Sequence, residues 1–221
     1  MSKTVVVTGA NRGIGLSFCR QLSEQGCRVF AVCRQPSAEL QQLDVTVIDG
    51  VDVARPEGIA RMVDGLSKQT IDLLINNAGV LRDEALGQLD YESIEQQFHV
   101  NALGPLRVTE ALLAQLNSGA KIAMITSRMG SIADNGSGGR YGYRMSKAAL
   151  NIAAVSLAKD LAPRGIAVGI FHPGLVATEM IGGHGDISPD QAAERLLARI
   201  DELTLASSGE FLHANGDTLP W

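Results

Sequence analysis

Short apolar segments rich in β-branched residues recur along this chain, and stretches with the apolar spacing of a helix separate them. The segments cover residues 3–8, 27–32, 45–48, 71–75, 121–126 and 166–171, and Phe211-Leu212 is a candidate for a short last strand. Helical spacing follows the first segment and recurs near 57–68, 104–117, 146–161 and 189–203. Strands that alternate with helices predict an α/β fold, a doubly wound parallel sheet of about seven strands with helices on both faces.

The length and composition limit the classes of function. A chain of 221 residues can bury a substantial core, so we expect a single domain over residues 1–221. The net charge of −5 argues against nucleic acid or an anionic membrane as the main partner. No apolar run approaches the ~20 residues of a membrane span, and no signal-peptide pattern precedes Thr4, so we expect a cytoplasmic protein.

Cysteine and histidine spacing gives no sign of a metal site. Cys19, Cys27 and Cys33 contain no Cys-x-x-Cys pair and are typical of reduced structural thiols. The histidines show no metal-ligand spacing with cysteines or carboxylates, so we expect no catalytic metal. His99 is interpreted as a packing residue, and His172 ends the sixth strand.

The first strand leads into a glycine-rich turn that is typical of phosphate binding. Gly9, Gly13 and Gly15 follow the strand directly, and a helix pattern follows them. A strand, a glycine turn and a helix in this order allow backbone N–H groups to approach a pyrophosphate. The spacing Gly-x-x-x-Gly-x-Gly differs from the Gly-x-Gly-x-x-Gly of most dinucleotide folds, and a plain turn is the alternative.

Tyr143 and Lys147 place a phenol and an ammonium group one helical turn apart. Residues four apart on a helix are neighbours on one face. A free tyrosine has a pKa of about 10, and a fixed positive charge beside it lowers that pKa toward working pH. The pair therefore predicts a proton donor and acceptor, although the same spacing also occurs on ordinary helix faces.

These motifs together resemble the short-chain dehydrogenase/reductase family. The matching elements are the Thr8-Gly9-x-x-x-Gly13-x-Gly15 turn, Asn76-Asn77-Ala78-Gly79, Asn101, Ser127, Tyr143-x-x-x-Lys147 and Pro173-Gly174. They span nearly the whole chain in the family's order. Within the family the chain resembles the carbonyl-reductase-like branch with C-factor-like and sniffer-like proteins. The resemblance implies a Rossmann-type fold and an oxidoreductase that transfers a hydride between nicotinamide and a carbonyl or alcohol substrate.

The resemblance also implies roles for the catalytic residues. Tyr143 would be the general acid in reduction and the base in oxidation. Lys147 would lower the pKa of Tyr143 and bind the nicotinamide ribose. Ser127 would hydrogen-bond the carbonyl oxygen as charge develops there, and Asn101 would bind a water of a proton relay. Asn101 serving only as a helix cap or turn residue is the alternative.

Spacing offers two candidates for the catalytic serine. Ser127 follows the fifth strand, where the family places its serine, but Tyr143 comes later than is usual. The glycine-rich stretch 135–139 would absorb the extra length. Ser131 is the rival by raw spacing. We favour Ser127 because a strand end fixes position better than a loop length does.

The residues after the second strand favour NADPH over NADH. An NAD enzyme needs an acid there to accept a hydrogen bond from the ribose 2′-hydroxyl, and the first acid in this chain is Glu39. Arg34 stands at that point instead, and Arg12 lies in the glycine turn. Two guanidinium groups suit a 2′-phosphate, so we expect NADP(H) as the cofactor.

The remaining cofactor residues follow from the resemblance. Asn11 and Ile14 belong to the glycine turn, Asp52 and Val53 match the adenine-contacting pair, and Asp52 capping the next helix is the alternative. Asn77, Ala78 and Gly79 line the fourth strand end. Pro173, Gly174, Val176 and Thr178 would approach the nicotinamide, although Thr178 could equally cap a short helix.

Two functions from different classes stay open. The first is a reductase of small carbonyl compounds, with the short glycine-rich segment 175–189 as a mobile lid. The second is an NADP(H)-binding signalling or regulatory protein of the C-factor type, with little or no turnover. The family forms dimers or tetramers through the helices near 104–117 and 146–161, and its carbonyl-reductase branch includes monomers. The sequence therefore allows a homodimer, a tetramer or a monomer.

Overall fold

The strands of the computed structural model, which describes residues 2–221, form one parallel sheet. Their bounds are β1 (Thr4–Thr8), β2 (Arg28–Val32), β3 (Thr46–Ile48), β4 (Ile71–Asn76), β5 (Leu116–Ile125), β6 (Ala167–His172) and β7 (Phe211–His213). The 7-stranded sheet has the order β3-β2-β1-β4-β5-β6-β7. The chain thus winds outward from β1 in one direction and from β4 in the other, which confirms the predicted Rossmann-type fold. Ligands bind at such a reversal of strand order, beyond the carboxyl ends of the strands.

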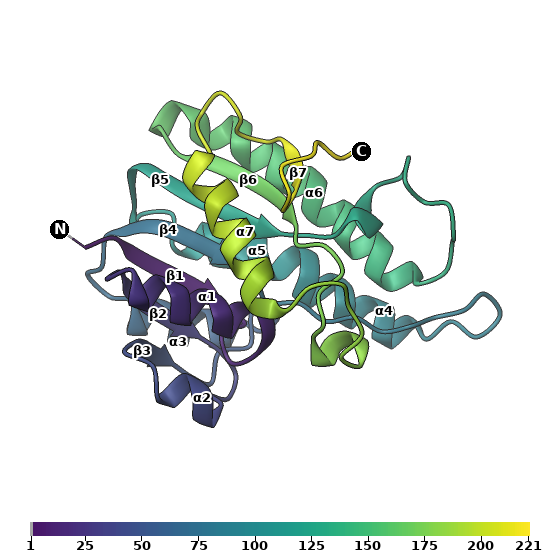
Figure 1. Cartoon of the computed structure of the whole chain (residues 1–221), viewed down its shortest axis with the longest axis horizontal. Coiled ribbons are helices and arrows are strands. Elements are labelled where there is room, and N and C mark those ends of the chain that lie inside the picture. The colour runs from purple at the N-terminus through teal and green to yellow at the C-terminus, as the bar shows by residue number, and fades with distance from the viewer. Residues whose placement is uncertain (1) are drawn as a thin grey trace.

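Helices cover both faces of the sheet (Figure 1). On the face turned toward the viewer lie α1 (Gly13–Glu24) and α7 (Pro189–Glu202), which contact each other. The other face carries α3 (Pro56–Gly65), α5 (Gly104–Ala111) and α6 (Tyr141–Leu161). The short helices are α2 (Ala38–Gln41), α4 (Tyr91–Phe98), the π-helix η1 (His99–Leu103), and the 3-10 turns η2 (Arg128–Gly130), η3 (Ala162–Arg164) and η4 (Glu179–Ile181).

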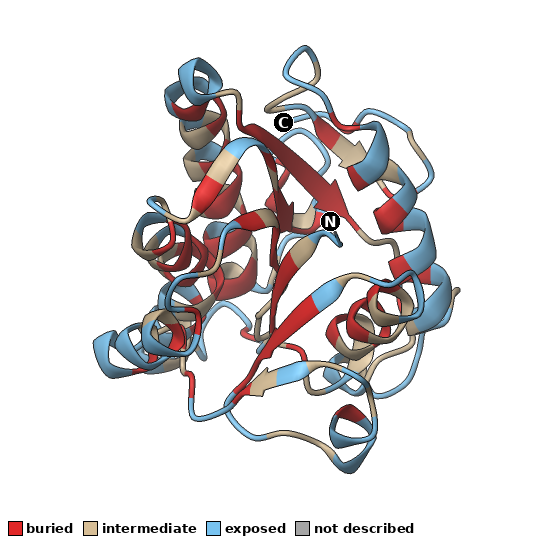
Figure 2. Cartoon of the chain, turned by 90° about the vertical axis from the view of Figure 1, so that its left-hand side faces the viewer, coloured by how far each residue is buried: buried red, intermediate tan, exposed pale blue. Residues whose placement is uncertain are grey.

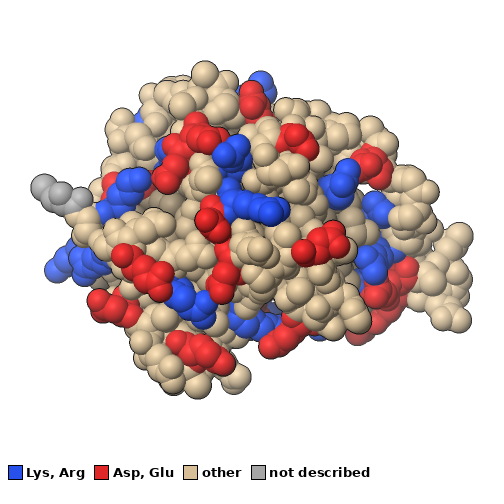
Figure 3. All heavy atoms as spheres, in the orientation of Figure 1, with Lys and Arg blue, Asp and Glu red and all other residues tan. Residues whose placement is uncertain are grey.

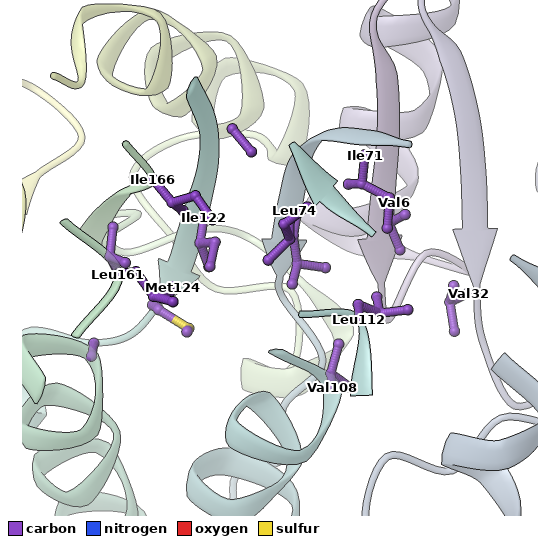
Figure 4. Close-up of a cluster of buried hydrophobic side chains, with 14 of the residues drawn as sticks. Val6, Val32, Ile71, Leu74, Val108, Leu112, Ile122, Met124, Leu161 and Ile166 are labelled. Atoms are coloured by element: carbon purple, nitrogen blue, oxygen red, sulfur yellow. The ribbon is translucent and has the colours of Figure 1, made fainter. Parts of the chain in front are cut away.

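Strand alternation divides the core into two layers. On β1, Val6 packs toward α3 and α5, while Val5 and Val7 pack toward α1 and α7. Figure 4 shows the first layer, where Val6 and Leu74 from neighbouring strands point toward Val108 of α5 and Leu112 just after it. The strands β1, β4 and β6 are almost wholly buried, and the outer sides of the helices are exposed (Figure 2). Continuous β-branched and leucine runs are the expected composition of strands buried on both faces.

The structure corrects the expected helix near 104–117. The helix α5 ends at Ala111, and β5 already begins at Leu116. Leu112 and Leu116 are both buried at a helical spacing, but Leu116 pairs with Ile71 of β4 instead. The Ile71 N–H donates to the Gln115 carbonyl over 2.8 Å, so pairing with the sheet replaces the last helical turn.

Acidic and basic groups are mixed on the face of the molecule that carries α1 and α7 (Figure 3). Within residues 2–221, no helix has the length and apolar character needed to cross a membrane.

Candidate active site

A cleft of about 1230 Å³ opens at the carboxyl ends of the strands. It gathers predicted residues from distant parts of the sequence. Those that line it are Gly9, Asn11, Arg12, Gly13, Ile14, Gly15, Arg34, Asp52, Val53, Asn77, Ala78, Gly79, Ser127, Tyr143, Lys147, Pro173, Gly174, Val176 and Thr178. Asn101 is the one predicted residue that does not line it.

The glycine turn lies against the end of β4 with no room for side chains. Gly9 has a φ of +67°, and a Cβ there would lie 2.8 Å from the Ala78 Cα. A Cβ on Gly15 would lie 2.1 Å from the Gly9 carbonyl oxygen. Close packing of the turn leaves the first turn of α1 open to the cleft, which is the arrangement that binds a phosphate at a helix N-terminus.

Side chains around the turn fix its backbone. The Thr8 hydroxyl accepts hydrogen bonds from the N–H groups of Asn77 and Ala78, each over 3.1 Å. The Asn77 amide donates to the Thr8 carbonyl over 3.0 Å. Asn77 therefore lies in the cleft as predicted, but its side chain supports the glycine turn.

Tyr143 and Lys147 lie one turn apart on α6, and both are buried. The Lys147 Nζ lies 5.8 Å from the centroid of the Tyr143 ring and donates to the Ile125 carbonyl over 2.9 Å. The ammonium is thus fixed between the phenol and the end of β5.

Burial dominates the protonation of both groups. It raises the pKa of Tyr143, while the neighbouring Ser127 hydroxyl and the Arg140 guanidinium act in the lowering direction. It lowers the pKa of Lys147 to about 8. The pKa of Tyr143 is therefore raised, whereas a positive charge at Lys147 alone would lower it. Desolvation of the phenolate outweighs the Ser127 hydrogen bond and the Arg140 charge.

The structure separates the two serine candidates. Ser127 caps η2, accepts a hydrogen bond from the Met129 N–H over 3.2 Å and lines the cleft beside Tyr143. Ser131 does not line the cleft, and its hydroxyl donates to the Trp221 carbonyl over 3.1 Å. A Cβ on Gly130 would lie 2.8 Å from the backbone of Lys147, so η2 packs tightly on α6.

Asn101 lies behind the cleft in the π-helix η1 and is fully buried. Its Oδ1 accepts from the Val80 N–H, and its Nδ2 donates to the Val80 carbonyl, each over 2.8 Å. Nδ2 also donates to the Ser146 hydroxyl over 3.0 Å. The side chain links the segment after β4 to α6. This role differs from the helix-cap alternative.

The end of β2 carries the predicted arginine and no acid. Arg34 is exposed, lines the cleft and forms no ion pair within residues 2–221. Glu39 lies in α2, outside the cleft lining. Arg12 instead donates to Glu179 of η4 over 2.5 Å, an ion pair in which both side chains are largely exposed.

Within residues 2–221, neither Asp52 nor Thr178 forms a side-chain cap bond to a helix. Asp52 accepts from the Ala54 N–H over 2.9 Å in the turn before α3, whose N-cap is Arg55. Thr178 occupies the N-cap position of η4 without a side-chain cap bond, and its methyl group lies 3.4 Å from a Cβ built on Gly13. The segment after Pro173 therefore packs over the glycine turn.

Two polar residues of the site, Glu84 and His213, are not predicted from the sequence. Buried Glu84 accepts from the Gly142 N–H over 3.2 Å and so fixes the first turn of α6. His213 of β7 lines the cleft opposite His172 of β6 in the strand register. Glu84 lies in an irregular segment and leaves no pattern, whereas His213 would follow from pairing the sixth and seventh strands. Within residues 2–221, no cluster of histidine, cysteine, aspartate or glutamate is placed to bind a metal.

A family model described as short chain dehydrogenase matches residues 3–187. The chain belongs to the short-chain dehydrogenase family. It is 43% identical, over 99% of both chains, to the 1-hydroxy-2-glutathionyl-2-methyl-3-butene dehydrogenase of Rhodococcus sp. (strain AD45). It is 47% identical to the C-signal protein of Myxococcus xanthus, over 68% of this chain and 93% of that one.

A solved structure supports the same assignment for the whole fold. The NADPH-bound carbonyl reductase from chicken fatty liver superposes with a TM-score of 0.90 at 30% identity, covering 100% of this chain and 99% of that one. The short-chain dehydrogenase family is one of oxidoreductases, and the predicted resemblance to its carbonyl-reductase and C-factor relatives is confirmed.

Proposed function

We propose that residues 1–221 form a single-domain, NADPH-dependent carbonyl reductase. The observation that carries the proposal is the meeting of Ser127, Tyr143 and Lys147 in one cleft with the glycine turn. These residues come from the end of β5 and from α6, and only the fold brings them together. A protein that merely binds a dinucleotide has no need of the serine and the tyrosine in one place.

The cleft fits a phosphorylated dinucleotide. A Cβ on Gly9 or Gly15 would clash with the neighbouring backbone of the glycine turn. With glycine at both positions, the backbone N–H groups of the turn are available to a pyrophosphate. Asp52 and Val53 line the same cleft beyond the end of β3, where an adenine would lie. The NADPH of the chicken fatty liver enzyme supports the same class of cofactor.

In the reduction, bound nicotinamide supplies the hydride. Tyr143 donates its phenolic proton to the carbonyl oxygen, and the Ser127 hydroxyl donates a hydrogen bond to the same atom as negative charge develops. Lys147, with its pKa near 8, is mostly cationic at neutral pH and stabilises the phenolate that remains. Asn101 of η1, which donates a hydrogen bond to Ser146 in α6, would help return a proton through a bound water.

Preference for NADPH rests on Arg34. Its exposed guanidinium, in a position without a competing acid, suits a 2′-phosphate. Arg34→Asp should weaken NADPH binding by about 100-fold, as expected for loss of a charge-assisted contact and gain of repulsion, and leave NADH nearly unchanged. Fluorescence titration of both cofactors measures this. Equal losses for NADPH and NADH would contradict the assignment.

The dehydrogenase of Rhodococcus suggests a substrate to include. Its name describes an alcohol next to a glutathionyl group. We therefore extend a panel of aromatic aldehydes, α-diketones, quinones and a pteridine with this alcohol, assayed in the direction of NADP⁺ reduction.

The deciding experiment follows NADPH oxidation by the wild type and by Tyr143→Phe. The variant should lose at least about 100-fold in kcat, the usual contribution of a positioned acid, and should keep its NADPH affinity. Ser127→Ala should lose activity, and Ser131→Ala, outside the cleft, serves as its matched control. Equal activity of Tyr143→Phe and wild type would overturn the mechanism.

A second candidate is an NADP(H)-binding signalling or regulatory protein. The 47% identity with the C-signal protein favours keeping it. Tight NADPH binding by the wild type with no turnover on the whole panel would support it over the reductase.

A further inference from the structure

Two histidines face each other at the ends of the last two strands. His172 of β6 and His213 of β7 are register partners, with ring centroids 5.0 Å apart and ring planes at 73°. Both line the cleft. The Thr126 N–H donates to the Phe171 carbonyl over 2.8 Å, which places His172 next to the strand end that leads into Ser127.

His172 offers an unpaired polar group in a buried place. Its side chain is almost fully buried, and its Nδ1 is buried with no partner within residues 2–221. Burial lowers the pKa of His172 to about 3, and the nearby His213 and Arg128 act in the same direction. The ring is therefore neutral at physiological pH and carries one proton.

That proton belongs on Nε2. An N–H on Nδ1 would be buried without an acceptor, which costs more than an unpaired lone pair. Nε2 forms no hydrogen bond in the described part of the chain and is not enclosed as Nδ1 is. His172 thus presents an N–H donor on its accessible side.

His213 also carries its proton on Nε2, because its Nδ1 accepts a hydrogen bond. The donor is the Asn215 N–H, 3.0 Å away, which leaves Nε2 as the protonated nitrogen. That nitrogen is 3.6 Å from a Cβ built on Gly174, beside the segment that follows β6. The two rings therefore bring two N–H donors to this end of the cleft.

We propose that His172 and His213 form a binding site for a second oxygen of the substrate, separate from the carbonyl oxygen that Ser127 and Tyr143 contact. Two donors without an acceptor fit a carbonyl, hydroxyl or carboxylate oxygen. The preferred substrates are then carbonyl compounds with an additional oxygen acceptor, such as dicarbonyls and hydroxyketones. This inference rests on the proposed reductase function and adds its substrate class.

The test compares 2,3-butanedione with 2-butanone, which share a carbon skeleton and differ by one oxygen. The measured quantity is the ratio of kcat/KM for the two compounds, relative to the wild-type ratio. His172→Phe and His213→Phe should each lower the ratio about fivefold, as expected for loss of one neutral hydrogen bond. His172→Gln, which retains a donor, should recover part of it. NADPH affinity should be unchanged in all three.

Gln25→Phe is the control for adding a phenyl ring elsewhere, because Gln25 is exposed and lies outside the cleft lining. Its ratio should equal that of the wild type. If His172→Phe does not fold, as judged by NADPH binding, His213→Phe decides. Turnover with an unchanged ratio in a folded His213→Phe would overturn the site and leave the reductase intact. Absence of wild-type turnover on every carbonyl compound would overturn the proposed function itself.

Discussion

Lys147 is a cation in a place where charges are costly. Its side chain is buried, with one hydrogen bond to the Ile125 carbonyl, and burial lowers its pKa from 10.5 to about 8. Between these two values the unfolded chain binds a proton that the native protein does not, so stability rises with pH in this window. Below pH 8 both states are protonated, and the contribution to the slope vanishes. A residue proposed for catalysis thus destabilises the fold at neutral pH.

We predict that Lys147→Met changes this pH dependence. The wild-type free energy of unfolding should gain about 1.4 kcal/mol per pH unit from Lys147 between its two pKa values, and the variant should lack that gain. Urea unfolding at pH 7, 8, 9 and 10 measures the difference. Parallel curves for the two proteins would mean that Lys147 is not shifted in the native state.

Arg12 and Glu179 form an exposed ion pair between the glycine turn and η4. Such pairs stabilise by roughly 0–1 kcal/mol, so a 2′-phosphate can compete for the guanidinium. Glu179→Gln should tighten NADPH binding by about threefold, or about 0.65 kcal/mol, which lies within that range, and leave NADH binding unchanged. Glu202→Gln, which breaks the exposed pair with Arg199, is the control. A change of the same size for both cofactors would assign Glu179 to lid packing.

At the scale of elements, η2 connects Ser127 with the α6 residues of the proposed catalytic set. Gly130 lies on the backbone of Lys147 in α6, whereas Gly136, in the same connection, has nothing within 4 Å of its Cβ position. Gly130→Ala should push η2 and Ser127 away from Tyr143, lower kcat about tenfold or more and leave NADPH affinity intact. Gly136→Ala should match the wild type in both. Equal kcat values for the two variants would show that the packing of η2 is not critical.

Elements with a strong period were predictable from the sequence, and deviations from a period were not. The runs that became β1, β4 and β6 have the composition of buried strands, and polar residues mark their carboxyl ends. The π-helix η1 adds a residue to a helical turn and leaves no sequence signature, so the contact of Asn101 with Ser146 is not predictable from the sequence. The end of α5 depends on the pairing of Leu116 with Ile71, which is a tertiary contact.

The candidate site shows the same division. The glycine turn, the serine after β5 and the pair Tyr143 and Lys147 each lie in a local pattern, so the sequence predicts them. The contacts between segments are absent from any local pattern. Examples are the Arg12–Glu179 ion pair, the Glu84 carboxylate at the start of α6 and the facing rings of His172 and His213.

At the scale of the whole molecule, the cleft exists only in the folded protein. Its residues come from nearly the full length of the chain, so the unfolded chain cannot bind the cofactor. NADPH at about 100 times its dissociation constant should therefore stabilise the protein by about 2.7 kcal/mol. A thermal unfolding series with rising NADPH measures this as a rising Tm. Arg34→Asp should reduce the rise, and a Tm independent of NADPH would contradict the cofactor assignment.

The strand order also has a consequence for how the protein is made. Since β1 pairs with β4, the strands that meet beneath the glycine turn are separated by β2 and β3 in the chain. A nascent chain still on the ribosome can pair β1 with β2, but it lacks β4, the second partner of β1, until residue 76 has emerged. Contacts between segments so distant in sequence form slowly. NADPH therefore cannot bind during the first steps of folding. It stabilises only molecules in which β1 has already paired with β4.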